Sequence, residues 1–389
     1  MKQEVQYLLE VVKYILNRKT GELPIPTNDL DWEKLIKLAK NHSILNLLHY
    51  GVDALPKEYK PDEQTCKHLY QSSVNAIVRN YNQIEGAKEL LETFEEKGIY
   101  ALAVKGICTK KHYPQTDMRT MGDVDILYQP QQNDEVKKVM RDLGYELSME
   151  GRKHDIYSRR PYMAIEMHRV LVAADSEYGS YYESIWNRIK TKENCKYIHE
   201  MSREDEYIFT IVHLARHFKD GGIGIRFIMD VYVYNHLDGM DWDYIKTELR
   251  KLKLWEFYGN ISQLADRWFG AEPRCDEENN ELFNKLFAYI ITDGTFGTTR
   301  NAAAASTAET GRFQSLLNAV FPSLKSMQSM FVWLEKWPIL LPYAWVLRGF
   351  RSITSKRRRR NIKYHVDKYR SSDRAYGEEL KRFYEACGL

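Results

Sequence analysis

The 389-residue chain lacks the features that mark several large classes of protein. It has five cysteines, and none of them lies in a C-x-x-C spacing, which argues against both a disulfide framework and a zinc cluster. The N-terminus has no apolar run of signal-peptide length, and no stretch approaches the roughly 20 apolar residues of a membrane span. These absences predict a soluble protein of the cytoplasm.

Charge of one sign is also missing. The 57 Lys and Arg residues nearly balance the 54 Asp and Glu residues, so the net charge is only +3. A near-neutral chain has no strong overall field to attract nucleic acid, which disfavours binding of RNA or DNA in the manner of a template-free polymerase. The 43% of apolar residues is sufficient for buried cores, and the length allows two or three domains.

Three segments with different hydrophobic patterns divide the chain. Residues 1–85 carry apolar residues at helical spacing and predict an N-terminal helical segment. Residues 86–198 alternate short apolar strands with helices and predict an α/β domain, and residues 199–389 return to the helical pattern. The predicted fold class is therefore α+β, with a small mixed sheet flanked by N- and C-terminal helical segments.

Individual elements can be placed within these segments. The first helical segment is expected to stop at Gly98, and the α/β domain has a short helix at 107–113 and another at 136–143 that ends at Gly144. Its strands are expected at residues 100–104, 124–128, 153–158 and 162–170, with the last two as an antiparallel pair. Later helices are expected at residues 207–218, 228–237, 243–268, 282–291 and 327–351, and a mobile loop at 294–311.

Three carboxylates of the α/β domain have the pattern of a metal site. Asp123 and Asp125 flank Val124 in an otherwise apolar strand, and residues i and i+2 of a strand point to the same face. Two like charges so close repel each other unless a cation is bound. Glu166, on a later strand, can supply a third oxygen ligand. The layout predicts catalytic carboxylates that hold Mg²⁺ or Mn²⁺ for attack on the α-phosphate of a nucleoside triphosphate; the alternative is an acidic pair that is merely solvated.

Cations and a glycine lie close to these carboxylates in the sequence. Lys105 and Arg119 are suited to phosphate oxygens, and Gly106 lies near the start of a short helix, so these three residues are predicted to bind the nucleotide. The alternative is a surface lysine and a loop arginine that is paired with a carboxylate. His168 shares the face of Glu166, where it is expected either to carry a proton or to hydrogen-bond that acid, and to face His154 across the antiparallel pair.

The sequence resembles the bacterial nucleotidyltransferase-like proteins of the DNA polymerase beta superfamily, which are often associated with surface-polysaccharide gene clusters. The resemblance implies a nucleotidyltransferase-type sheet and transfer chemistry, and its most specific part is the Asp-x-Asp strand with its arginine. Typical members carry Gly-Ser where this chain has Lys105-Gly106. The matching stretches are Asp31-Trp32, Leu38-Ala39 with His42, Val104-Lys105-Gly106, Tyr113-Pro114, Arg119, Gly122 to Leu127, Leu143-Gly144-Tyr145, Ile165 to His168, and His213, His217, Arg226 and Asp230.

Polar residues of the C-terminal segment form a second group. His213 and His217 are four residues apart and share one face of a predicted helix, and Arg226 and Asp230 follow a glycine-rich turn. One interpretation is a polar network that packs this segment onto the α/β domain. The other is that these residues contact the nucleotide or the acceptor across a cleft, or hold in place the side chains that do so.

An apolar, aromatic stretch is followed by five consecutive cations within residues 331–360. Such a stretch can dock peripherally on an anionic membrane. Two prolines interrupt it, however, and a core helix followed by a solvated charge run is the favoured interpretation.

These observations together predict a metal-dependent nucleotidyltransferase. It would move a nucleoside monophosphate from a nucleoside triphosphate to a hydroxyl or phosphate acceptor, which is a small molecule, a sugar or a protein. The alternative is a catalytically silent protein that keeps the fold for binding or regulation. The presence of all three carboxylates disfavours this alternative, because they repel one another without metal.

Overall fold

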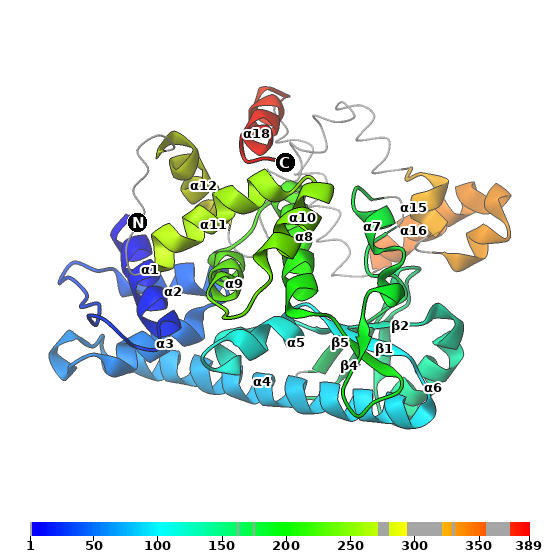
Figure 1. The fold of residues 1–389 in the computed structure, drawn as a ribbon, viewed down its shortest axis with the longest axis horizontal. Coiled ribbons are helices and arrows are strands. Elements are labelled where there is room, and N and C mark those ends of the chain that lie inside the picture. Colours follow the sequence, from blue (N-terminus) through cyan, green and yellow to red (C-terminus); the bar gives the residue numbers. More distant parts are fainter. Residues whose placement is uncertain are drawn as a thin grey trace.

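One mixed β-sheet and many helices make up the structure, which is the α+β class that the sequence predicts (Figure 1). The structure is a computed structural model, and helical segments precede and follow its sheet along the chain. The expected mobile loop at 294–311 and the basic run at 356–360 lie outside the described residues. The residues described are 2–161, 163–173, 176–270, 280–293, 321–328, 331–354 and 374–389.

The N-terminal part contains four helices, α1 (Lys2–Leu16), α2 (Trp32–Asn41), α3 (Leu45–Ala54) and α4 (Glu63–Lys97). Helix α4 is 35 residues long and runs along one edge of the molecule, from α3 to the sheet (Figure 1). It ends at Gly98, as predicted, and this glycine has a left-handed conformation with φ of 71°. Gly86 lets α4 approach the sheet closely, because a Cβ atom there would lie 2.6 Å from Cε of Met163.

Helices α3 and α4 also hold the loop that leads into the central strand. This entry loop, residues 113–123, lies between the sheet and the N-terminal helices, and its backbone and side chains accept hydrogen bonds from both of them. The contacts are Asn46 Nδ2 to the Asp117 carbonyl (2.9 Å), Tyr50 hydroxyl to the Asp117 carboxylate, Asn80 Nδ2 to Thr116 Oγ1 (2.9 Å) and Gln83 Nε2 to the Met121 carbonyl (3.1 Å).

The sheet has seven strands among the described residues, in the order β3-β4-β5-β2-β1-β7-β6. The four predicted strands and the antiparallel pairing of the last two are confirmed, whereas β3, β6 and β7 were not expected. Strands β6 and β7 have two and three residues, which are too few for a hydrophobic pattern. Strand β3 alternates apolar Leu147 and Met149 with Glu146 and Ser148, but all four residues are exposed. The strands are β1 (Ala101–Val104), β2 (Val124–Tyr128), β3 (Glu146–Met149), β4 (His154–Arg159), β5 (Met163–His168), β6 (Lys190–Thr191) and β7 (Ile198–Glu200).

Both faces of the central strand β2 are covered. Val124 and Ile126 belong to a core that includes Leu90 of α4 and Met140 of α6 (Asn133–Asp142). Leu127, on the opposite face, belongs to the larger core of the helical segments. Because side chains alternate along a strand, the carboxylates at 123 and 125 lie on the face that the C-terminal helices cover.

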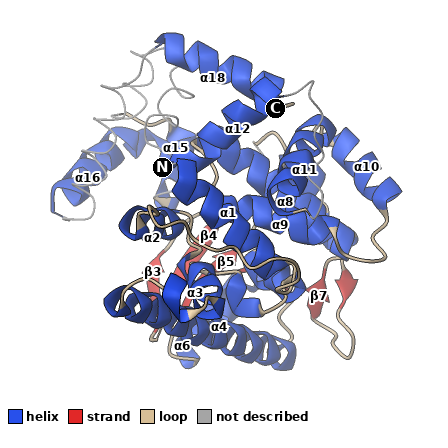
Figure 2. Ribbon diagram, turned by 90° about the vertical axis from the view of Figure 1, so that its left-hand side faces the viewer, coloured by secondary structure: helices blue, strands red, loops and turns tan. Residues whose placement is uncertain are grey.

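The C-terminal helices lie above the sheet in Figure 2, with strands in red and helices in blue, whereas α4 and α6 lie below it. Two further short helices, α5 (Gly106–Thr109) and α7 (Gly179–Tyr182), lie within the α/β region. The later helices are α8 (Arg203–Asp220), α9 (Ile225–Asn235), α10 (Trp242–Lys251), α11 (Trp255–Phe269), α12 (Asn280–Asp293), α15 (Leu324–Gln328), α16 (Leu341–Thr354) and α18 (Arg374–Ala386).

Two of the long predicted helices are wrong. The helix expected at 243–268 is divided into α10 and α11, because the chain turns at Lys253, which has a positive φ of 57°. The helix expected at 327–351 is replaced by α15, two 3₁₀ turns and α16. Pro338 begins the second turn and cannot donate the backbone hydrogen bond that a continuous helix needs.

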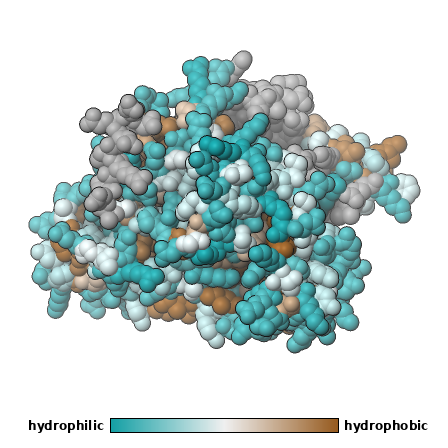
Figure 3. All heavy atoms as spheres, in the orientation of Figure 1, coloured by the Kyte–Doolittle hydropathy of each residue, from teal (hydrophilic) through white to brown (hydrophobic). Residues whose placement is uncertain are grey.

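The stretch around α16 is not the core helix that the sequence favoured. The side chains of Trp337, Ile339, Tyr343 and Val346 are exposed, and the exposed fraction of Ile339 reaches 85%. Figure 3 shows hydrophobic residues gathered at this end of the molecule. In the described part of the chain, no helix is both long and apolar enough to cross a membrane.

Candidate active site

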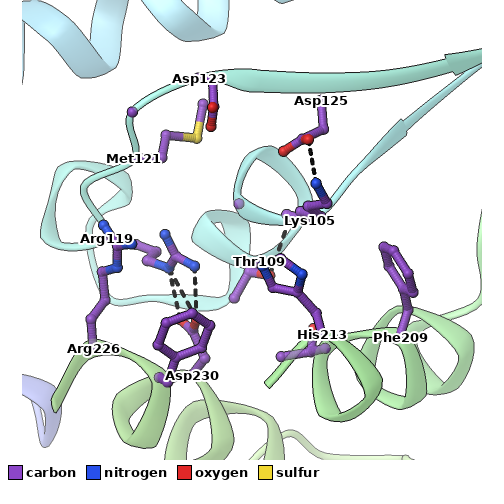
Figure 4. A pocket seen from close by; sticks show the side chains of 14 residues that line it. Lys105, Thr109, Arg119, Met121, Asp123, Asp125, Phe209, His213, Arg226 and Asp230 are labelled. Carbon is purple, nitrogen blue, oxygen red and sulfur yellow. Dashed lines mark hydrogen bonds and ion pairs between the residues drawn. The ribbon is translucent and has the colours of Figure 1, made fainter. Parts of the chain in front are cut away.

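The three predicted carboxylates are brought together by the pairing of two parallel strands. Asp125 of β2 lies directly beside Glu166 of β5 in the register, and Asp123 immediately precedes β2. Asp125 is buried, with an exposed fraction of 6%. Figure 4 shows Asp123 and Asp125 on the same strand above the pocket that they line, with α8 and α9 on its opposite side.

Asp125 has two basic partners. Lys105 Nζ lies 2.5 Å and His168 Nε2 lies 2.8 Å from its Oδ1 atom. Burial alone would raise the pKa of Asp125, but Lys105 and then His168 more than offset this effect and hold it well below its usual range. Lys105 is therefore paired with a carboxylate, an arrangement that differs from both phosphate binding and the surface lysine that the sequence left open.

The backbone of Lys105 has an unusual conformation, with φ of 60° and ψ of −132°. Glycine adopts positive φ angles readily, whereas a lysine in this conformation costs on the order of 1–3 kcal/mol. The bond of its Nζ atom to Asp125 is one interaction that offsets this cost.

Asp123 differs from Asp125 because it has no hydrogen bond or ion pair with any described residue. Burial, Asp125 and Glu166 raise the pKa of Asp123 to about 6. Its negative charge is thus poorly compensated in a partly buried position. Carboxylate oxygens are the ligands that Mg²⁺ and Mn²⁺ prefer, so these three residues have the right chemistry for a divalent cation. Among the described residues, however, the three side chains whose ligand atoms all lie within 4.8 Å of one another are His154, Glu166 and His168.

Glu166 lies between two histidines. Nε2 of His168 is 3.3 Å from Oε2 of Glu166, and Nε2 of His154 is 3.9 Å from Oε1. The contact with His168 lowers the pKa of Glu166, and the hydrogen bonds with Asp125 and Glu166 raise the pKa of His168 although burial opposes this. The expected facing of His154 and His168 is present, with ring centroids 4.9 Å apart.

Arg119 is anchored to the C-terminal helices rather than directed at an open space. Its Nε and Nη2 atoms donate to the two carboxylate oxygens of Asp230 at 2.8 Å each, and Nη1 donates to the carbonyl of Thr120 at 2.9 Å. The hydroxyl of Tyr113 donates to Asp230 Oδ1 at 2.6 Å. Most donors of Arg119 are thus used inside the protein. This is the alternative in which the arginine is paired with a carboxylate, and the carboxylate is Asp230 of α9.

Arg226 is the second guanidinium at the pocket. Nη1 donates to the carbonyl of Thr120 at 2.9 Å, whereas the buried Nε atom has no hydrogen-bond partner within the described ranges. Burial and the neighbouring Arg119 lower the pKa of Arg226 to about 10. A buried donor without a partner is costly. Arg226 also lines the pocket, so its guanidinium charge would attract an anion there.

The pocket is partly open, and its roughly 570 Å³ of free space includes the part that opens to solvent. His213 lines it, and His217 packs against His213 with ring centroids 4.4 Å apart but does not line it. Glu166 and His168 do not line it either. The lining residues are Lys105, Gly106, Thr109, Arg119, Met121, Gly122, Asp123, Asp125, Phe209, Thr210, His213, Arg226, Phe227 and Asp230.

Several of these lining residues carry no sequence signal for function. Thr109, Met121, Phe209, Thr210 and Phe227 are ordinary helix or loop residues, and only the fold places them at the pocket. His154 is different, because an acid and a histidine at i and i+2 opposite another histidine could have indicated a metal-binding group.

Comparison with known proteins gives the family of the chain. Residues 28–270 match a protein family described as uncharacterised nucleotidyltransferase. This span runs from just before α2 to the end of α11, and contains every strand and every pocket residue. No curated protein and no solved structure matches the chain. The match covers more than half of the chain, and the protein therefore belongs to this family of nucleotidyltransferases.

Proposed function

We propose that the protein transfers a nucleoside monophosphate from a nucleoside triphosphate to a hydroxyl or phosphate acceptor, with divalent metal held by Asp123, Asp125 and Glu166. The observation that carries the proposal is the pairing of Asp125 with Glu166 on adjacent strands beside an Asp123 without a counter-charge. When bound, Mg²⁺ or Mn²⁺ would neutralise phosphate charge in the site.

The transfer has a simple balance. An oxygen of the acceptor attacks the α-phosphorus, the bond from that phosphorus to the bridging oxygen of the β-phosphate breaks, and pyrophosphate leaves. Glu166 is the proposed acceptor of the proton from an attacking hydroxyl. Arg226 would contact the phosphates with its unpartnered Nε donor, and His213, whose pKa is lowered by burial and His217, would offer a neutral imidazole to the acceptor.

The proposal is tested by incubating the protein with each labelled nucleoside triphosphate and Mg²⁺ or Mn²⁺. Mass analysis then follows the label in the protein itself, in small molecules and sugars, and in added candidate proteins. Appearance of a nucleotidyl adduct together with pyrophosphate supports the proposal. Failure of all nucleotides to bind in calorimetry, with either metal, would overturn it.

Glu166→Gln is expected to separate binding from turnover. Glutamine keeps the shape of the side chain but cannot take a proton, so we expect metal–nucleotide affinity to persist while the transfer rate falls on the order of 10²-fold or more. Calorimetry and a pyrophosphate-release assay measure the two quantities. Glu146→Gln, at an exposed position of edge strand β3, is the control. Equal losses of affinity and rate would mean that Glu166 mainly holds the metal of the triphosphate.

Arg226→Gln is expected to weaken nucleotide binding on the order of 10- to 100-fold, because a charge-assisted hydrogen bond contributes about 1.5–3 kcal/mol. Arg226→Lys retains the charge but not the Nε donor, so its nucleotide affinity should lie between those of wild type and Arg226→Gln. Calorimetric titration with each Mg²⁺–nucleotide measures the effect, and Arg216→Gln on the exposed surface of α8 is the control. An unchanged affinity in Arg226→Gln would show that this guanidinium does not touch the nucleotide.

One observation favours the second candidate, a catalytically silent nucleotide-binding or regulatory protein. Lys105 and His168 compensate Asp125 within the protein, so not all three carboxylates need metal to be retained. The argument from their mutual repulsion therefore rests mainly on Asp123. Tight nucleotide binding without transfer to any acceptor would support this candidate over the enzyme.

A further inference from the structure

Three potential metal ligands outside the Asp-x-Asp pair, His154, Glu166 and His168, lie close together on strands β4 and β5. His154 of β4 and His168 of β5 are direct partners in the antiparallel register, and Glu166 precedes His168 by two residues on the same face. One ligand atom from each of the three side chains lies within 4.8 Å of the other two. The ligand set is thus two imidazoles and one carboxylate, supplied by rigid neighbouring strands.

The spacing of these atoms is close to that of a bound ion. A tetrahedral ion with bonds of about 2.1 Å separates its ligand atoms by roughly 3.4 Å. His168 Nε2 lies 3.3 Å from Oε2 of Glu166 and His154 Nε2 lies 3.9 Å from Oε1, so each histidine is beside a different oxygen of the carboxylate. Small side-chain rotations would bring all three atoms to one centre.

Hydrogen bonding alone does not account for the whole group. His168 is bonded to both Asp125 and Glu166, but His154 Nε2 is too far from Glu166 for a hydrogen bond, and it has no other such partner among the residues described. The side chain of His154 is 29% exposed and that of Glu166 19%, so an ion could enter from solvent on this side.

We propose that His154, Glu166 and His168 form a binding site for a transition-metal ion of the Zn²⁺ or Co²⁺ type. Imidazole ligands favour such ions, whereas the all-oxygen group around Asp123 favours Mg²⁺ or Mn²⁺. The site does not depend on the proposed transfer activity. An ion bound there would nevertheless change the surroundings of Asp125, because His168 Nε2 cannot bind an ion and remain hydrogen-bonded to Asp125 at the same time.

The test is a titration of the full-length protein, freed of metal by chelation, with Co²⁺ and then with Zn²⁺. Ordered Co²⁺ bound by imidazole and carboxylate gives visible absorption bands that the hydrated ion lacks, so the spectrum reports the ligands without any assay of activity. We expect one such ion per chain, displaced by Zn²⁺. The ion should also raise the melting temperature, as any ligand of the folded state does.

Variants decide whether these residues are the ligands. His154→Ala should lower Co²⁺ and Zn²⁺ affinity by at least about 100-fold, more than the roughly 10- to 100-fold typical of losing an outer partner. His154→Cys keeps a ligand atom and should retain binding. His199→Ala, at a partly buried histidine of β7, is the control and should bind like wild type. Because Asp123 is not a ligand here, Asp123→Asn should also retain Zn²⁺ binding.

Three results would overturn the site. They are wild-type affinity in His154→Ala, an equal loss in His199→Ala, or absence of the Co²⁺ bands in wild type. Loss of binding in Asp123→Asn alone would instead assign the ion to the Asp-x-Asp group. Failure of nucleotide transfer, by contrast, has no bearing on the titration, so the two proposals fail separately.

Discussion

Asp123→Asn and Asp125→Asn are expected to abolish metal-dependent nucleotide binding alike, yet to change the stability of the metal-free protein in opposite directions. Asp123 has a raised pKa of about 6 in the folded protein, so its ionisation destabilises the fold as the pH rises from about 4 to about 6. Asparagine removes this penalty, which is at most on the order of 3 kcal/mol at neutral pH.

Asp125 has a lowered pKa, so its ionised form contributes stability at neutral pH that is lost only as the pH falls through the folded value. Asp125→Asn leaves Lys105 and His168 without their carboxylate. Breaking a buried ion pair from one side costs about 3–5 kcal/mol, and part exposure of Lys105 places the loss at or below the lower end.

Urea denaturation at pH 7 and pH 4.5, with metal removed, measures both effects, and calorimetry measures nucleotide binding. Asp142→Asn, at the exposed end of α6, provides the control for a loss of negative charge in the same region. The gain in Asp123→Asn should be present at pH 7 and smaller at pH 4.5. A loss of stability in both variants would contradict the distinction drawn between the two carboxylates, and wild-type Mg²⁺–nucleotide affinity in both would rule out the metal site.

The second large effect is expected for Asp230→Ala. Asp230 has an exposed fraction of 1% and accepts three hydrogen bonds from Arg119 and one from Tyr113. Removing it leaves the buried Arg119 beside Arg226 with no opposing charge, which should destabilise the protein by about 3–5 kcal/mol. Urea denaturation measures the loss, and Asp238→Ala, at an exposed position soon after α9, is its control.

A double variant tests the cause of that loss. Arg119→Met removes the charge that Asp230→Ala leaves unpaired, so the double variant should be more stable than Asp230→Ala alone. If the two losses simply add, the pair is not the reason for the instability. A loss below about 1 kcal/mol in Asp230→Ala would show that the contact contributes little.

Local patterns in the sequence were sufficient for the central strands and for the meeting of the carboxylates. Short apolar runs identify β2 and β5, and each run contains an acid. The sequence therefore predicts that Asp125 and Glu166 lie in one site, and the strand register places them side by side. The edge strands were not predicted: β6 and β7 are too short to show alternation, and β3 alternates Leu147 and Met149 with polar residues over only four positions. The break at Lys253 was missed because a non-glycine residue with positive φ has no distinctive sequence signal.

The roles of the cations could not be derived in the same way. Arg119 and Asp230 are 111 residues apart, and no local periodicity states which acid a buried arginine will meet. Proximity in sequence to the Asp-x-Asp strand therefore favoured a phosphate role for Arg119, whereas the fold places the guanidinium with an unpartnered donor at position 226. The assignment of the phosphate ligand remains a prediction that the Arg226 variants test.

Helix α4 is expected to tolerate substitutions along its exposed side but not insertions or deletions. One added residue would rotate everything beyond it by about 100° and displace it by about 1.5 Å. Asn80 and Gln83, which hold the entry loop, and Gly86, which meets β5, would then no longer share their present orientation with the start of the helix beneath α3. The number of residues between α3 and β1, more than their identity, is thus the quantity that natural variants of this protein are expected to preserve.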